Sequence, residues 1–155
     1  MSENEIRQMI TETVQWLNEH TRFAENRSYM QHGTKSVYEH CIQVAEKSCK
    51  LAWKHNMKVS YPELIRGALL HDYFLYDWHA KDNNTHRLHG FFHAKKALAN
   101  AQRDVELTAV EADIIRHHMF PLNLFHPPRC KEAWVVCIAD KICAFQETIH
   151  RKTIK

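Results

Sequence analysis

The sequence is poor in residues that break helices and has no long apolar run. Its 155 residues include three glycines and four prolines, which leaves little material for the tight turns of a β-rich fold. No segment approaches the run of about 20 apolar residues that a membrane span needs. Glu3, Glu5 and Arg7 stand where a secretory signal would be apolar. We therefore expect a helical, soluble, cytoplasmic protein with no membrane partner.

Paired cysteines and an excess of one charge are also missing. The five cysteines form no C-x-x-C pair, and most lie in apolar runs, so we interpret them as reduced core thiols. The net charge is only +3, and the basic residues are interspersed with acidic ones. This distribution does not indicate a nucleic-acid partner, and it suits a small phosphorylated molecule equally well. It leaves open whether the chain forms a homo-oligomer.

Length and composition favour one domain over residues 1–155. A chain of this size can bury a single core, and 45% hydrophobic with 25% charged residues is ordinary for a globular protein. No stretch alternates at period two, so we expect no strands. The predicted fold class is all-α, a compact bundle of about six or more helices. The thirteen histidines are the unusual feature.

Helix-start signals recur along the chain. Each has a Ser or Thr at the N-cap position, in some cases with a glutamate three residues later or an early proline. The predicted starts are Ser2 with Glu5, Thr34, Ser60 with Pro62, and Thr108 with Glu111. The first helix is expected to run to about His20. Pro121 is expected to end the helix that follows Thr108.

One long segment lacks helical periodicity. Residues 73–90 mix aromatic and polar side chains, so we expect a loop there, and loops of that length are often functional. The next helix is expected to start near His93. The most apolar run of the chain, residues 133–139, then predicts a last helix that contains Asp140.

Polar side chains fall on the apolar faces of these helices. His40 lies three residues after Val37, so its imidazole belongs on or beside a buried stripe. A single such histidine is more often a core residue bonded to a backbone carbonyl. His71 and Asp72 repeat the pattern at the end of an apolar helix, where an unpaired carboxylate would be costly.

Asp140 is the third case. It lies three residues after Cys137 in the apolar run, and a buried aspartate is rare unless it meets a cation or a metal. Lys141 projects about 100° away on a helix and is not expected to neutralise it. Three elements thus direct imidazole or carboxylate inward. We infer a shared divalent metal site, for which Mn, Fe, Co, Ni, Zn and Mg are not distinguished.

Taken in chain order, these inward-facing residues resemble the signature of the HD-domain superfamily of metal-dependent phosphohydrolases. The chain is similar to small single-domain members of bacterial type. The superfamily signature is a histidine, a His-Asp pair and a distant aspartate, all on helices. Here these are His40, His71 with Asp72, and Asp140, and the following Lys141 is similar too. The resemblance covers nearly the whole chain. It implies hydrolysis of a phosphate ester, such as a nucleotide, by a metal-activated water.

Many members of that superfamily hold a second metal with two further histidines. His93 is similar to the first of them. For the second, periodicity does not choose between His117 and His118, and we favour His118 because similar small proteins keep the segment at residues 118–122. The resemblance then implies two metal ions bridged by Asp72. One ion would take His40, His71 and Asp140, and the other His93 and His118.

Further residues are candidates for catalysis and substrate binding. Asp72 and Lys141 are the predicted catalytic residues. Basic side chains that could hold phosphate oxygens are Lys141, Arg129 and Lys95, although solvated surface charge competes for the last two. Trp78 and His89 are predicted substrate contacts.

Two other functions stay open at this point. Some proteins of the superfamily hold two irons and are oxygenases, and six candidate ligands suit that chemistry. A non-catalytic metal-binding regulatory module is the third alternative. The complete ligand set argues against it, because a degenerate copy usually loses some ligands.

Overall fold

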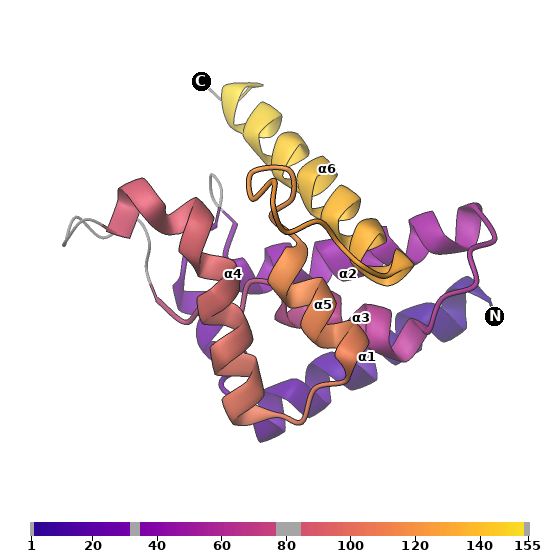
Figure 1. Ribbon diagram of the computed structural model, residues 1–155. Helices are drawn as coiled ribbons and strands as arrows, with labels where there is room; N and C mark the ends of the chain where they lie inside the picture. The colour runs from indigo at the N-terminus through magenta and orange to yellow at the C-terminus, as the bar shows by residue number, and fades with distance from the viewer. Residues whose placement is uncertain (1, 32–34, 77–84, 154–155) are drawn as a thin grey trace.

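The chain is all-α, as predicted. The computed structural model describes residues 2–31, 35–76 and 85–153, with the side chains of 85–91 and 150–153 left out. Its helices are α1 (Glu3–His20), η1 (Phe23–Ser28), α2 (Val37–Lys54), α3 (Tyr61–Leu70), α4 (Thr85–Asp104), α5 (Ala109–His117) and α6 (Lys131–Thr153) (Figure 1). Within these residues the only β pairing is an isolated bridge between Met30 and Ser36.

Capping side chains set three of the helix starts. Ser2 with Glu5 caps α1, and Thr108 with Glu111 caps α5, which confirms both predicted capping boxes. The predicted N-cap Thr34 is wrong for α2. Ser36 takes that position, because Glu39 stands three residues after it and closes a reciprocal capping box. Thr34 itself lies outside the described residues.

The predicted loop over residues 73–90 is wrong in its last part. Helix α4 begins at Thr85, so His93 lies in the middle of a helix instead of opening it. This segment has no apolar period, but Leu, Arg and Lys are good helix formers and a single Gly90 is tolerated. Residues 77–84 of the predicted loop lie outside the described residues.

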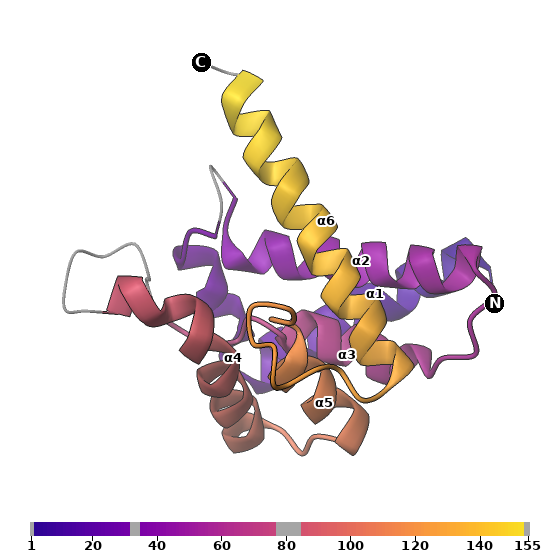
Figure 2. The same cartoon turned by 45° about the horizontal axis from the view of Figure 1, so that its top comes forward.

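Helix α3 is the centre of the bundle. It contacts α1, α2, α4, α5 and α6, and six of its ten residues are buried. Figures 1 and 2 show α6 crossing α2, with the C-terminal part of α6 extending beyond the other helices. No helix in the described part of the chain is long and apolar enough to cross a membrane.

A glycine lets α3 and α5 approach closely. A Cβ atom added to Gly67 would lie 2.5 Å from Cδ1 and 3.1 Å from Cβ of Ile114. Distances below 3.0 Å are too short for real carbon contacts. This approach matters for the site, because α3 is followed directly by His71 and Asp72 and α5 by His118.

Candidate metal centre

The six predicted ligands come together in the interior. Helices α2, α4 and α6 carry His40, His93 and Asp140, while His71, Asp72 and His118 follow the last turns of α3 and α5. All six residues are buried, with exposed fractions of 9% or less. Five helices therefore contribute to one buried polar cluster, which we call the ligand cluster.

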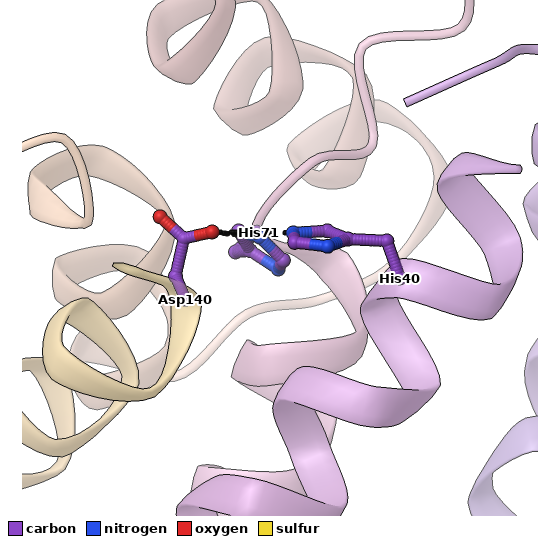
Figure 3. Close-up of side chains that lie close together, drawn as sticks. All are labelled: His40, His71 and Asp140. Carbon is purple, nitrogen blue, oxygen red and sulfur yellow. Dashed lines mark hydrogen bonds and ion pairs between the residues drawn. The ribbon is translucent and has the colours of Figure 1, made fainter. Parts of the chain in front are cut away.

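One end of the ligand cluster is formed by His40, His71 and Asp140. His40 on α2 and Asp140 on α6 point toward each other, with His71 between them (Figure 3). The Nε2 atom of His40 lies 3.1 Å from Oδ1 of Asp140, and Nε2 of His71 lies 3.8 Å from the same oxygen. These three residues can hold a metal ion, since one ligand atom of each lies within 4.8 Å of the others.

Asp72 lies between the two ends of the cluster. Its Oδ2 atom is 3.5 Å from Nε2 of His71 and 3.9 Å from Nε2 of His40. Its Oδ1 atom is instead 3.2 Å from Nε2 of His93 and 3.4 Å from Nε2 of His118. Each carboxylate oxygen thus serves a different pair of histidines.

Backbone carbonyls orient two of the imidazole rings. Nδ1 of His71 lies 2.7 Å from the carbonyl oxygen of Ala68, and Nδ1 of His118 lies 2.8 Å from that of Ile115. A carbonyl can only accept, so each Nδ1 must carry the proton. In the neutral ring the lone pair is then on Nε2, which faces the ligand cluster.

The carboxylates of the cluster raise the pKa values of two of its histidines. Burial alone would lower the pKa of His40, but hydrogen bonds with Asp140 and Glu147 raise that pKa to about 10. Burial opposes the charged form of His71 as well, yet the carboxylate of Asp72 raises the pKa of His71 well above its ordinary value. Protons on these rings balance the buried carboxylates, and a bound cation would do the same while releasing protons.

The pKa values of Asp72, Asp140 and His118 are lowered instead. Burial would raise the pKa of Asp72 and of Asp140, but the neighbouring histidines outweigh burial and hold both pKa values well below the ordinary range. For His118 burial dominates and lowers the pKa below its ordinary value of 6.5. A neutral imidazole is the form that binds a metal.

The cluster fits a divalent metal. Nε2 of His71 is buried and has no hydrogen-bond partner among the described residues. The Nε2 atoms of His93 and His118 lie 2.9 Å apart, at hydrogen-bond distance, and both lie within 3.4 Å of Oδ1 of Asp72. A second set that can hold an ion is His71, Asp72 and His118. Imidazole with carboxylate suits Mn, Fe, Co, Ni and Zn.

His117 points away from the cluster. Its Nδ1 atom lies 2.6 Å from Oδ1 of Asp113, one turn earlier on α5, and its ring stacks on that of His126 at 6.3 Å. His118 is the one of the pair whose ring faces Asp72. Periodicity had left both histidines open, and the packing of α5 separates them.

Lys141 lies at the rim of the cluster. Its Nζ atom donates to the carbonyl oxygen of His118 at 2.6 Å and lies 3.5 Å from Oδ2 of Asp140. The expectation that Lys141 points away from Asp140 is therefore wrong, because its long side chain brings Nζ back to that carboxylate. The side chain is 41% exposed, so solvent reaches this positive group.

Of the other predicted substrate residues, the structure describes Arg129 and Lys95, and both are exposed. Arg129 is exposed and is held through its backbone N–H, which donates to Asp113 at 2.9 Å. In the described part of the chain its guanidinium makes no hydrogen bond or ion pair with a cluster residue. Lys95 is exposed on α4. Trp78 and the side chain of His89 lie outside the described residues.

Two buried residues next to the cluster were missed from sequence. Gln31, in the connection before α2, donates from Nε2 to Oδ2 of Asp72 at 2.6 Å. Glu147 on α6 lies 3.1 Å from Nδ1 of His40. The position of Glu147, two helical turns after Asp140, is a signal that could have been used. Gln31 lies in a segment without any period, and nothing in the sequence marked it.

Comparison with known proteins agrees with this geometry. A family model described as HD domain matches residues 37–144, which is more than half of the chain. No match to a curated protein and no match to a solved structure was found. The chain belongs to the HD domain family. The matched segment contains all six residues of the ligand cluster.

Proposed function

We propose that this protein is a dinuclear, metal-dependent phosphohydrolase that acts on a small phosphate ester, such as a nucleotide. The observation that carries the proposal is the position of Asp72, whose two oxygens face different pairs of histidines. A carboxylate placed in this way suits a bridge between two cations. His40, His71 and Asp140 would hold one ion, and His93 and His118 the other.

The chemistry follows from this ligand set. A pair of divalent ions lowers the pKa of a bound water and offers positive charge to phosphoryl oxygens. The chain contributes ligands whose rings are already oriented, because carbonyl oxygens hold the Nδ1 atoms of His71 and His118. Burial excludes bulk water from the ligand cluster.

We also propose that Lys141 contacts the phosphate. Its ammonium group is partly exposed at the rim, beside Asp140, and the bond to the carbonyl of His118 uses only one of its three hydrogens. A phosphate oxygen that approaches Asp140 would meet this positive charge. Arg129 and Lys95 lack comparable support. The proposed roles of Trp78 and His89 rest on the sequence alone.

The test is metal analysis of the natively purified protein, followed by a screen with the metal that is found. The screen covers phosphomonoesters, nucleotides and cyclic nucleotides. We expect about two divalent ions per chain and phosphate release with at least one class of substrate. A mixed-valence di-iron centre that consumes dioxygen would instead favour the oxygenase of the same superfamily. Protein that binds no divalent metal would contradict both enzymes.

A further inference from the structure

Glu147 is a buried acidic residue at the ligand cluster that the proposed function does not use. Its side chain is 2% exposed, and its Oε1 atom lies 3.1 Å from Nδ1 of His40. The match to the HD domain family ends at residue 144, so Glu147 lies outside the matched segment.

His40 is held between two carboxylates of the same helix. Asp140 lies 3.1 Å from Nε2, and Glu147 lies 3.1 Å from Nδ1 on the other side of the ring. The two acidic residues are seven positions apart on α6, which is about two helical turns and places them on one face. Helix α6 therefore fixes the ring of His40, which comes from α2.

The other oriented histidines of the cluster differ in what holds them. His71 and His118 use Nδ1 to donate to a backbone carbonyl three residues earlier in their own segments. Of these three histidines, His40 is the one whose Nδ1 faces a carboxylate. A carboxylate is charged where a carbonyl is neutral, so it makes the imidazole a stronger electron donor at Nε2.

Packing alone is a poor reason for a glutamate at this position. Apart from His40, its ion-pair partner among the described residues is Lys35, with Nζ 4.0 Å from Oε1, and Oε2 has no hydrogen-bond partner there. Burying a carboxylate with so few partners costs free energy that an apolar side chain of similar size would not. A function at His40 explains why the charge is there.

We propose that Glu147 is a positioning residue of the metal centre. It accepts the Nδ1 proton of His40, so that the Nε2 lone pair faces His71 and Asp140, and its charge strengthens His40 as a ligand. The proposal rests on the metal site of the proposed function. In this role the carboxylate of Glu147 does not touch the metal and acts on it only through the imidazole of His40.

The experiment measures the affinity of the full chain for Co²⁺, by visible absorption and by competition with a chelator. Wild type is compared with Glu147→Gln, which keeps an acceptor oxygen without the charge, and with Glu147→Leu, which keeps neither. We expect Glu147→Leu to bind Co²⁺ about 10- to 100-fold more weakly, with Glu147→Gln in between. The absorption bands of bound Co²⁺ should shift in both variants, a change that a purely structural role would not produce.

The matched control is Glu132→Gln. Glu132 is another buried glutamate of α6, but it accepts from the backbone N–H of Ser60 at 3.1 Å, away from the ligand cluster. Its Co²⁺ affinity should equal that of wild type. Thermal unfolding of all four proteins separates affinity from stability, and Glu147→Leu should be about as stable as wild type.

Three results would overturn the proposal. Both Glu147 variants could bind Co²⁺ with the affinity and spectrum of wild type, which would leave the proposed function intact and remove only the role of Glu147. A Glu147→Gln chain that does not unfold cooperatively would assign this residue to the fold. Wild-type protein that binds no Co²⁺ or other divalent ion would instead remove the metal site, and both proposals with it.

Discussion

At the scale of single residues, Asp72 is the side chain on which the ligand cluster depends most. Four imidazoles have Nε2 within 4.0 Å of its carboxylate, those of His40, His71, His93 and His118. We predict that Asp72→Ala abolishes metal-dependent turnover and keeps the helical circular dichroism near that of wild type, because the residue supplies charge and little apolar packing.

Asp113→Asn is the matched control for that variant. Asp113 also contacts a histidine, His117, but outside the ligand cluster. Turnover by Asp113→Asn should stay near that of wild type. Normal turnover by Asp72→Ala would show that the site has been assigned to the wrong residues.

The neighbouring histidines His117 and His118 give a second test at this scale. Only His118 faces Asp72, while His117 bonds to Asp113. Replacing His118 with Ala should lower the metal content from about two ions to about one per chain, since an ion that loses one of few ligands binds much more weakly. His117→Ala should leave the metal content unchanged, and the reverse pattern would exchange their roles.

At the scale of helices, the contact of α3 with α5 is set by Gly67. Alanine is favoured over glycine in a helix by about 1 kcal/mol, but overpacking costs about 1 to 3 kcal/mol, and the added Cβ would collide with Ile114. We expect Gly67→Ala to lower the free energy of unfolding by about 1 kcal/mol, measured by urea denaturation. The shift would also move His71 relative to His118 and weaken metal binding.

A double-mutant cycle provides the control for this prediction. In an Ile114→Ala background the Cδ1 and Cγ2 atoms that crowd Gly67 are gone. There Gly67→Ala should stabilise the protein through helix propensity. Equal effects in the two backgrounds would mean that the contact with Ile114 does not determine the spacing of α3 and α5.

Asp113 connects α5 to the start of α6. Its Oδ2 atom accepts the backbone N–H groups of Arg129 and Cys130 at 2.9 and 3.0 Å. Burial would raise the pKa of Asp113, but these N–H groups and His117 lower it below the ordinary value of 3.8. The resulting stabilisation is present above pH 3.8 and is lost as the pH falls through the lower pKa of the folded state.

Asp113→Asn should be less stable than wild type at pH 7, and the difference should shrink as the pH falls below about 4, where the wild-type carboxylate takes up its proton. Urea denaturation at a series of pH values measures it. A difference that stays constant over the whole range would mean that the charge of Asp113 contributes nothing.

At the scale of the whole molecule, the ligand cluster joins α2, α4 and α6 to the ends of α3 and α5. Metal bound there would stabilise the folded chain by mass action, by about 2.7 kcal/mol at a concentration 100 times Kd. For a domain of this size that corresponds to a rise in Tm of about 5 to 10 °C. Calorimetry with Mn²⁺, before and after a chelator, measures the shift, and an equal rise in Asp72→Ala would place the ion elsewhere.

The sequence by itself determined which residues are available for the site. His40, His71, Asp72 and Asp140 stand on apolar helical faces, and burial of such groups is costly without partners, so their convergence could be predicted from local periodicity. The capping boxes of α1 and α5 were also predictable from the sequence, because each joins residues three positions apart.

Only the tertiary structure decided what depends on contacts between distant segments. The start of α4 at Thr85 follows no apolar period, and which of His117 and His118 faces Asp72 depends on how α5 packs. Gln31 reaches Asp72 across 41 residues and Glu147 reaches His40 across 107, so both contacts depend on how distant segments pack. Local patterns fix which face of a helix is buried, whereas the packing of α2, α3 and α6 fixes which polar groups meet there.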